Sequence, residues 1–418
     1  MEAPIFISEL ELTEPITGIT LPAREEGPGY NGARLLVRMQ RLPVGYVLVP
    51  PDSLDPNGIS HQVWLALAKN INMLRSQAGL AALDTLPIDG IKREASLASK
   101  PTDCPLVTVV LCTRERPDSV VATLRGLTVM QYPLFEIVVV DNAPSSNATK
   151  EAVQREFGSD PRVRYICEPR PGLSCARNRG VKEAIGDIIA FTDDDVKVDP
   201  WWLDGIMRGF RAAPDVACVT GLVATAEIEN AAQLYFDLRA GWGNLLERKI
   251  FDLTENRDKS SLYPYAPGMF GTGANFAISG KVLNELGGFD EALGAGTPSG
   301  GGEDLEIFIS VILNGNRLVH EPSAVVSHYH RSDVRELEKQ MTGYGSGCTA
   351  AITAILLKNS RARREVPFKI ASGVMHIFTL RNRVRNNSTL PSGLMVRDVR
   401  GMLSGPRLYF KGRHKLRR

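Results

Sequence analysis

From Pro105 onward, short apolar runs alternate with segments of helical periodicity, and this alternation constrains the fold more than any other feature. The apolar runs are residues 106–112, 135–140, 163–167 and 187–192. The segments between them carry apolar residues at helical spacing, over 117–130, 147–157 and 174–185, with Ser174 as a candidate N-cap and Gly186 as a stop. Continuous β-branched runs separated by helices predict a mostly parallel sheet buried on both faces, that is, a doubly wound α/β fold.

Polar residues follow each of these runs. In an open α/β sheet, ligands bind beyond the carboxyl ends of the strands, so these residues are the ones expected to form a site. They are Thr113, Arg114 and Arg116 after the first run, Asp141 after the second, Arg177 beyond the third, and Asp193, Asp194 and Asp195 after the fourth. We expect them to converge on one edge of the sheet.

The strongest local signal is the acidic triplet Asp193-Asp194-Asp195. Three adjacent carboxylates repel one another, and a hard divalent cation offsets that charge. In extended geometry Asp193 and Asp195 point to one side and Asp194 to the other. A metal held by one or two carboxylates while it touches a diphosphate is a usual Mg²⁺ or Mn²⁺ arrangement. The alternative is a solvated acidic turn that caps a helix beginning near Pro200.

Two further pairs are candidates for chemistry. Glu303-Asp304 follows three glycines and opens a predicted helix over 305–313, so it supplies either a general base or only carboxylates that suit a helix N-terminus. His328 and His330 follow the apolar run 324–326. Two histidines at this spacing can face one site from a strand, where either would complete a metal shell or bind phosphate; the alternative is a surface pair on an edge strand.

Trp201-Trp202 is either a sugar-stacking surface or part of the core.

The two ends of the chain differ from this central part. Residues 1–102 predict a small α/β module of unknown role, with strands near 34–39 and 45–49 and a helix over 60–78. Residues 333–358 read as a helix, and its glycines between 343 and 347 predict a kink or close helix packing. We therefore expect a catalytic domain over 103–335 and a helical, basic C-terminal region over 336–418.

Charge is distributed unevenly along the chain. The whole sequence has a net charge of +2, which argues against a nucleic-acid binder, but residues 359–418 hold 15 Lys and Arg against 2 Asp and Glu, and residues 1–358 hold 34 against 45. The basic region is either a solvated terminus or a surface attracted to an anionic bilayer or lipid phosphate. The apolar segment 368–380, followed by Arg381, Arg383 and Arg385, suits either a membrane interface or burial against the catalytic domain.

The sequence also predicts where the protein resides. No basic region followed by an apolar stretch is visible after Met1, and the six cysteines are scattered, which is typical of a reducing compartment. The apolar run over 348–357 is too short to span a bilayer. We expect a cytoplasmic protein, at most peripheral at a membrane.

Residues from about 105 to 345 resemble a family 2 glycosyltransferase with the GT-A fold. Six stretches carry the resemblance: Val107-Thr108-Val109-Val110-Leu111-Cys112-Thr113-Arg114, Glu136-Ile137-Val138-Val139-Val140-Asp141-Asn142, Gly172-Leu173-Ser174-Cys175-Ala176-Arg177-Asn178, Phe191-Thr192-Asp193-Asp194-Asp195, Gly273-Ala274-Asn275 and Gly302-Glu303-Asp304-Leu305. Several ordered motifs over this length are far more specific than any one of them.

The resemblance implies a role for each matching residue. Asp304 would be the catalytic base, with Glu303 as its neighbour. Asp195 and Asp193 would bind Mn²⁺ or Mg²⁺, with His328 or His330 as a further ligand. The nucleotide-sugar donor would be bound by Thr113, Arg114, Arg116, Asp141, Arg177, Asp193, Asp194 and Asn275.

The implied reaction is transfer of a sugar, with inversion, from a nucleotide diphosphate sugar to a hydroxyl of a small-molecule, saccharide or lipid-linked acceptor, as in hexosyltransferases. Two rival functions are less favoured. A sugar-1-phosphate nucleotidyltransferase is expected to have a Gly-rich nucleotide-binding loop after its first strand, whereas residues 112–116 of this chain contain no glycine. A non-catalytic nucleotide-sugar-binding partner has no need of both the acidic triplet and Glu303-Asp304.

Overall fold

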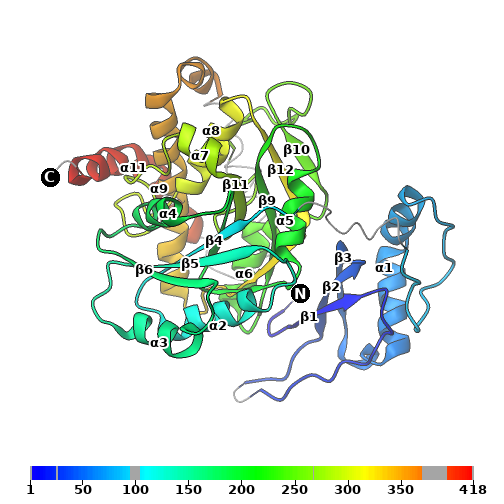
Figure 1. Cartoon of the computed structure of the whole chain (residues 1–418). Coiled ribbons are helices and arrows are strands. Elements are labelled where there is room, and N and C mark those ends of the chain that lie inside the picture. The colour runs from blue at the N-terminus through cyan, green and yellow to red at the C-terminus, as the bar shows by residue number, and fades with distance from the viewer. Residues whose placement is uncertain (1, 25–26, 95–103, 267, 370–392, 417–418) are drawn as a thin grey trace.

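A nine-stranded mixed sheet lies at the centre of the molecule (Figure 1). The structure is a computed structural model and describes residues 2–24, 27–94, 104–266, 268–369 and 393–416. The strands occur in the order β10-β12-β9-β11-β7-β4-β5-β6, with β8 paired to β12. Their bounds are β4 (Val107–Thr113), β5 (Phe135–Asn142), β6 (Val163–Glu168), β7 (Ile188–Asp193), β8 (Val196–Val198), β9 (Val216–Thr225), β10 (Lys249–Phe251), β11 (Asn275–Ser279) and β12 (Arg317–His328). This confirms the predicted α/β class, because the pairs from β7 through β4 and β5 to β6 are all parallel.

Helices cover both faces of this sheet, which explains why its strands are apolar throughout. Along β4, Val107, Val109 and Leu111 enter one core, whereas Val110 enters the other. The helices between its strands are α2 (Pro117–Thr128), α3 (Ala148–Phe157), α4 (Leu173–Glu183), α5 (Trp202–Phe210), α6 (Ala231–Ala240), the 3₁₀ turn η3 (Trp242–Asn244), α7 (Gly280–Glu285) and α8 (Glu303–Leu313). The four strands predicted from the apolar runs are thus confirmed, with shifts of one or two residues at their ends.

One predicted helix start is wrong. Gly172, with φ of 130°, is the N-cap of α4, and Ser174 lies inside the helix. The Ser174 hydroxyl is buried and donates a hydrogen bond to the carbonyl of Leu293 at 2.7 Å. Glycine takes this position because its backbone conformation is strained for any residue with a Cβ.

The N-terminal region folds around its own core. It contains β1 (Phe6–Glu11), β2 (Ala33–Met39), β3 (Leu42–Val49), η1 (Pro51–Ser53) and α1 (Pro56–Gln77). The strand β1, which pairs in parallel with β2, has no counterpart among the predicted elements. Buried ion pairs join this sheet to the region of the nine-stranded sheet: Arg38 contacts Asp199 at 2.5 Å, and Arg34 contacts Asp237 at 2.7 Å. The N-terminal region is therefore attached beside the central sheet.

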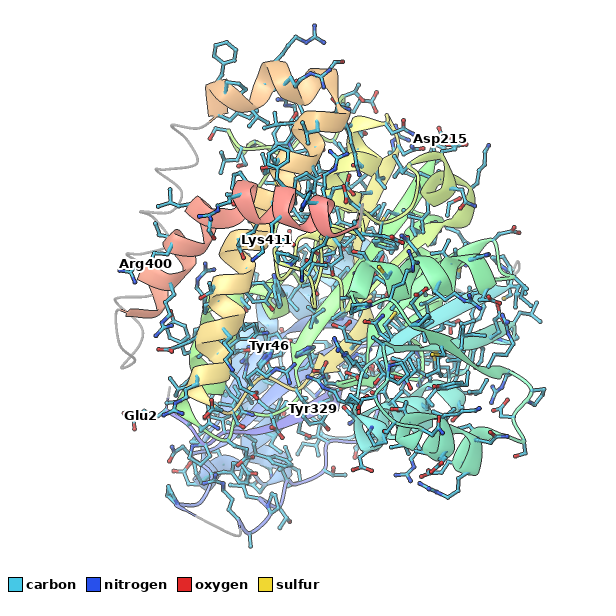
Figure 2. The ribbon with its side chains drawn as sticks, turned by 90° about the vertical axis from the view of Figure 1, so that its left-hand side faces the viewer. Glu2, Tyr46, Asp215, Tyr329, Arg400 and Lys411 are labelled. Atoms are coloured by element: carbon cyan, nitrogen blue, oxygen red, sulfur yellow. The ribbon has the colours of Figure 1, made fainter. Side chains whose placement is uncertain are left out.

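Two long helices complete the described fold, α9 (Val334–Lys358) and α11 (Gly393–Leu416). Figure 2 shows α11 lying across α9. The predicted interfacial segment 368–380 with Arg381, Arg383 and Arg385 lies almost wholly outside the described residues. In the part of the chain that the structure describes, no helix combines the length and apolarity needed to cross a membrane.

A buried histidine in β12 makes folding sensitive to pH. His320 forms hydrogen bonds with the Thr220 hydroxyl at 3.2 Å and the Leu245 carbonyl at 2.8 Å, and burial lowers its pKa. His320 therefore binds a proton more readily in the unfolded chain than in the folded one. The contribution of neutral His320 to the stability of the fold is present above about pH 6.5 and is lost as the pH falls below this value. We expect His320→Gln to flatten the fall in unfolding free energy between about pH 6.5 and pH 5, by up to about 1.4 kcal/mol per pH unit. Urea unfolding of both proteins across this range measures the difference; parallel curves would contradict it.

Candidate active site

Two carboxylates and one imidazole come together at the carboxyl end of β7. Asp193 is the last residue of β7, Asp195 follows in the turn before β8, and His328 is the last residue of β12. Antiparallel pairing of β8 with β12 sets His328 opposite Val196, the residue next to Asp195. The His328 Nε2 atom lies 3.2 Å from Asp195 Oδ1. One potential ligand atom from each of the three residues lies within 4.8 Å of the others.

The electrostatics of this group suit a cation. Burial raises the pKa of Asp193, and Arg177 offsets only part of that rise, to which the charge of Asp195 adds. Burial also acts to raise the pKa of Asp195, but the hydrogen bond and charge of His328, with Arg331 and Arg116, hold it below its usual range. Two carboxylate oxygens and one imidazole nitrogen form a donor set that Mn²⁺ or Mg²⁺ can use, with the positions for substrate oxygens left over.

The middle residue of the triplet faces the other way, as expected from extended geometry. The Asp194 carboxylate accepts hydrogen bonds from the Thr113 hydroxyl at 2.6 Å and from Arg116 at 3.0 Å. Burial raises the pKa of Asp194 to about 6, because the hydrogen bond from Thr113 and the charge of Arg116 offset only part of the effect of burial. Asp194 and Thr113 thus tie the end of β7 to the end of β4. The triplet does not cap α5, since Asp199 accepts the hydrogen bond from the Trp201 N–H at 2.8 Å.

The two histidines occupy different environments. His330 is buried, its Nε2 atom is 3.1 Å from the Thr225 hydroxyl, and its ring lies 4.6 Å from that of Phe236. Burial lowers its pKa to about 3. The structure therefore brings His328, and not His330, to the carboxylates. Arg331, which the sequence reasoning did not single out, lies 3.4 Å from Asp195; its position three residues after His328 was the available signal.

A buried arginine links this group to the N-terminus of α8. Arg177 donates hydrogen bonds to Glu303 Oε1 and to the carbonyl of Gly273, both at 3.0 Å, and lies 3.7 Å from Asp193. The Gly273 N–H donates to Asp304 Oδ2 at 2.7 Å. A Cβ at Gly273 would lie 2.9 Å from the Arg177 guanidinium and 3.1 Å from the Asp304 carboxylate, so a larger residue here would displace one of these side chains.

The neighbouring acids of α8 differ in exposure. Glu303 is buried against Arg177, and burial raises its pKa to about 7, although Arg177 opposes the rise. The second oxygen of Glu303 has no hydrogen-bond partner among the described residues. Asp304 is half-buried, so its carboxylate is the more accessible of the two. Glu303 holds Arg177, and Asp304 faces the site.

Glycines of α9 allow this helix to pack closely against the loop that precedes α8. A Cβ on Gly347 would lie 2.6 Å from the carbonyl carbon of Gly301, and Gly302 has φ of 93° with Gly347 close beneath it. The predicted close packing at 343–347 is confirmed: α9 supports the loop that delivers Glu303 and Asp304.

We expect Gly347→Ala to lower the unfolding free energy by about 1–3 kcal/mol, although alanine favours helix formation, because the methyl group would overlap the loop backbone. The matched variant is Gly343→Ala on the same helix, where the nearest atom would be 3.2 Å away, the Gly300 carbonyl oxygen. Chemical denaturation compares the two; equal stabilities would contradict the close-packing argument.

The predicted donor-binding residues fall into two groups. Thr113, Arg114, Arg116 and Asp141 lie at the ends of β4 and β5, beside the acidic triplet. Asp141 is buried and accepts a hydrogen bond from the Tyr165 hydroxyl at 2.8 Å, whereas its other oxygen has no partner among the described residues. Burial raises its pKa, which the Tyr165 hydrogen bond opposes. An unsatisfied buried carboxylate oxygen at this edge is ready to accept a hydrogen bond from a ligand.

Asn275 is committed to the fold. It is fully buried at the start of β11, where its oxygen accepts from the Trp202 indole N–H at 2.7 Å. Its amide nitrogen donates to the carbonyls of Leu222 and Ala324. These bonds hold β11, β9 and β12 together, and they leave the Asn275 side chain facing the core and not the carboxylates.

An aromatic surface borders the site on the side of α9. The Tyr344 side chain is 40% exposed, its ring lies 5.8 Å from the Trp242 ring at an edge-on angle of 88°, and its hydroxyl accepts from Gln340 at 3.0 Å. Burial and the charges of Asp304 and Asp193 raise the Tyr344 pKa. Sequence reasoning did not select Tyr344 or Trp242. Amphipathic rings beside carboxylates form a surface on which a sugar can stack.

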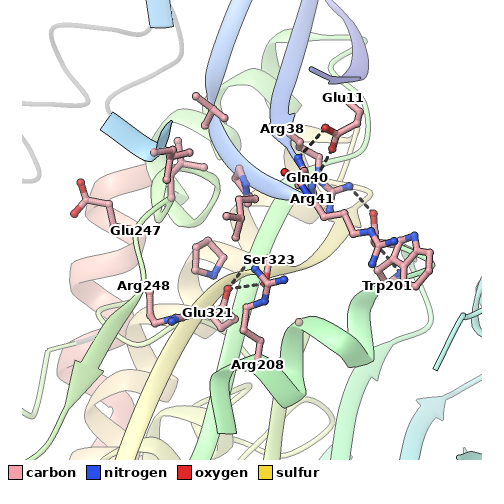
Figure 3. Close-up of a pocket in the computed structure, with 18 of the residues that line it drawn as sticks. Glu11, Arg38, Gln40, Arg41, Trp201, Arg208, Glu247, Arg248, Glu321 and Ser323 are labelled. Atoms are coloured by element: carbon pink, nitrogen blue, oxygen red, sulfur yellow. Dashed lines mark hydrogen bonds and ion pairs between the residues drawn. The ribbon is translucent and has the colours of Figure 1, made fainter. Parts of the chain in front are cut away.

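A large cavity of about 1830 Å³ lies elsewhere, between the N-terminal module and the catalytic domain (Figure 3). Much of its charge is paired internally, as in the contact of Arg248 with Glu321 at 2.5 Å. The guanidinium of Arg41 lies 3.2 Å from the centroid of the Trp201 ring, and Trp202 is buried. The tryptophan pair therefore serves the domain interface and the core, and the candidate active site is the carboxylate edge of the sheet.

Part of this chain matches a known protein family. Residues 108–284 match the family model for glycosyl transferase family 2. Over these residues the chain is similar to family 2 glycosyltransferases. The matched region holds Thr113, Asp141 and the acidic triplet, and it ends before Asp304 and His328.

Curated relatives of this region include proteins from bacteria and archaea. The pre-mycofactocin glycosyltransferase of Mycobacterium tuberculosis is 27% identical over 279 residues, which are 66% of this chain and 52% of the relative. The succinoglycan biosynthesis protein ExoM of Rhizobium meliloti is 29% identical over 229 residues, 53% of this chain and 65% of ExoM. The glucosyl-dolichyl phosphate glucuronosyltransferase of Haloferax volcanii is 24% identical over 227 residues, 53% of this chain and 68% of the relative. The chain thus spans about half to two thirds of the length of these relatives.

Among solved structures, the mannosyltransferase PcManGT from Pyrobaculum calidifontis, in complex with GDP-Man and Mn²⁺, is similar to this chain. The TM-score is 0.52 at 17% sequence identity, and the similarity covers 83% of this chain and 96% of PcManGT. This shows that the two share the fold.

Proposed function

We propose that the protein transfers a sugar from a nucleotide diphosphate sugar to an acceptor hydroxyl, with inversion at the anomeric carbon, and that Asp304 is the general base. The observation that carries the proposal is the placement of Arg177 between Asp193 and the start of α8, where Gly273 also contacts Asp304. It joins a cation-binding group and an accessible carboxylate in one site.

The residues would divide the chemistry as follows. Asp304 accepts the proton of the acceptor hydroxyl while that oxygen bonds to the anomeric carbon, and the bond from the anomeric carbon to the diphosphate oxygen breaks on the opposite side. Asp193, Asp195 and His328 would hold a divalent cation, which would supply Lewis-acid stabilisation to the leaving diphosphate. Arg331, 34% exposed beside Asp195, can add a hydrogen bond to a phosphate oxygen. The open oxygen of Asp141 is placed to accept from the nucleoside.

The experiment that tests this function combines donor binding with turnover. Thermal stabilisation is measured with a panel of nucleotide sugars that includes GDP-mannose and UDP-glucuronic acid, with Mn²⁺, Mg²⁺ or chelator. Bound donor at 100 times its dissociation constant adds about 2.7 kcal/mol to stability, so a preferred donor is readily distinguished. Release of the nucleoside diphosphate from that donor supports the proposal. Release of pyrophosphate from a nucleoside triphosphate and a sugar 1-phosphate would favour a nucleotidyltransferase, and binding without any turnover a non-catalytic partner.

A further inference from the structure

The outward surface of the C-terminal helix α11 combines exposed apolar and cationic side chains. We call this surface the outer face of α11; it consists of Arg400, Leu403, Arg407, Phe410, Lys411 and His414. Their spacing places them within an arc of about 100° around the helix. Leu403 is 81% exposed and Phe410 52% exposed, and the four polar residues are exposed as well. Leu403 and Phe410, seven residues apart, lie together along one edge of this arc, and the cations lie beside them, which is the arrangement of a helix that rests in an interface.

The rest of α11 is fixed, so the outer face has one orientation. Gly401 and Gly405 lie on the opposite side of the helix and pack on α9, where a Cβ on Gly401 would lie 2.5 Å from the Thr342 carbonyl oxygen. The Thr349 hydroxyl donates to the Met402 carbonyl at 2.7 Å, and the Tyr409 hydroxyl donates to Asp290 at 2.9 Å. Because of these close contacts, α11 cannot rotate about its axis, and so it cannot bury Leu403 and Phe410 against the rest of the chain.

The charge of α11 indicates the sign of the partner. The helix carries six Lys and Arg residues and Asp398 as its one acid. Arg397 pairs with Glu338 at 2.9 Å, and Arg413 packs over the ring of Tyr409. Among the described residues, no carboxylate forms an ion pair with Arg400, Arg407 or Lys411. Figure 2 shows Arg400 and Lys411 along this helix, on the flank formed by α9 and α11.

We propose that the outer face of α11 docks on an anionic lipid bilayer. A bilayer interface satisfies both features at once, because Leu403 and Phe410 enter the boundary of the acyl chains while the cations contact anionic headgroups. A soluble polyanion would bind the cations and leave the apolar side chains in water. The helix lies on the surface and does not span it.

Docking through α11 would also place the catalytic machinery near the membrane. The inner side of α11 packs on α9, and Gly343 and Gly347 of α9 pack on the loop that leads to Glu303 and Asp304. This chain of close contacts makes α11, α9 and the start of α8 one rigid unit. The docking itself does not depend on sugar transfer, so its test is independent of the proposed function.

The test is co-sedimentation of the full chain with vesicles of phosphatidylcholine alone or of phosphatidylcholine with phosphatidylglycerol, at low and high salt. We expect binding to the anionic vesicles that weakens with salt. One variant combines Arg400→Gln, Arg407→Gln and Lys411→Gln, and a second combines Leu403→Ser and Phe410→Ser. Each should lower the partition coefficient by about 100-fold.

The matched control changes an exposed apolar residue and an exposed cation on α1, Leu65→Ser with Lys69→Gln, and should bind as the unchanged protein does. Circular dichroism verifies that every variant is folded. The proposal is overturned by absence of vesicle binding, by equal binding to both vesicle types, or by unchanged binding of either α11 variant. Loss of binding in the charge variant alone would also overturn it, since that result describes a simple polyanion site.

Discussion

Asp304→Asn is expected to lower the rate of sugar transfer by about 10³-fold and to leave donor binding intact. The physical reason is that Asn cannot accept the proton that leaves the acceptor hydroxyl, whereas the proposed contacts of the donor lie with the proposed metal ligands and the ends of β4 and β5. Asp304 is anchored on one side by the Gly273 N–H at 2.7 Å and is half-buried, which orients its carboxylate without removing it from the site.

The measurement is nucleoside diphosphate release under single-turnover conditions, together with the donor dissociation constant from thermal stabilisation. Glu151→Gln is the matched control, because Glu151 is an exposed acid in the first turn of a different helix, α3. Near-normal transfer by Asp304→Asn would show that another group takes the proton and would remove the central residue of the proposed mechanism.

Asp195→Asn is expected to weaken Mn²⁺ binding by about 100-fold or more and to lower donor binding with it. Asp195 is the carboxylate whose pKa lies below its usual range despite burial, so it presents a full negative charge to a cation. Mn²⁺ titration followed by intrinsic fluorescence gives the affinity, and addition of a chelator to the unchanged protein gives the metal-free reference.

Asp194→Asn separates metal binding from folding. The Asp194 carboxylate contacts Thr113 and Arg116 and faces away from His328. Its replacement should lower stability by about 1–3 kcal/mol and retain Mn²⁺ affinity. Equal Mn²⁺ affinities in the Asp195 variant and the unchanged protein, or donor binding that a chelator leaves unaltered, would show that the carboxylate group does not hold the metal.

Much of the glycosyltransferase domain could be predicted from local pattern. Each parallel strand is a short apolar run, and its length and flanking turns are set by residues that are neighbours in the sequence. The side that each acid of the triplet faces also follows from local geometry, since successive residues of an extended chain alternate. For this reason the pairing of Asp193 with Asp195, and the turning away of Asp194, agreed with expectation.

Other features depend on residues far apart in the sequence. The commitment of Asn275 to the fold arises from contacts with Trp202, Leu222 and Ala324, which three separate elements contribute. The stacking of Arg41 on Trp201 joins two domains. Local periodicity contains no information on such partners, so a polar or aromatic residue that serves the core resembles one that serves a ligand.

The sequence by itself determined the order of the strands and helices from β4 to β7, the acidic end of β7 and the acid pair that opens α8. Only the tertiary structure decided which histidine joins them. His328 and His330 are equivalent by spacing, but β12 pairs with β8 so that His328 lies opposite Val196, while His330 is drawn into the core against Thr225 and Phe236. Strand register over more than a hundred residues of separation made that choice, because it depends on the irregularity between Glu321 and Val325 and on the burial of partners that no local pattern specifies.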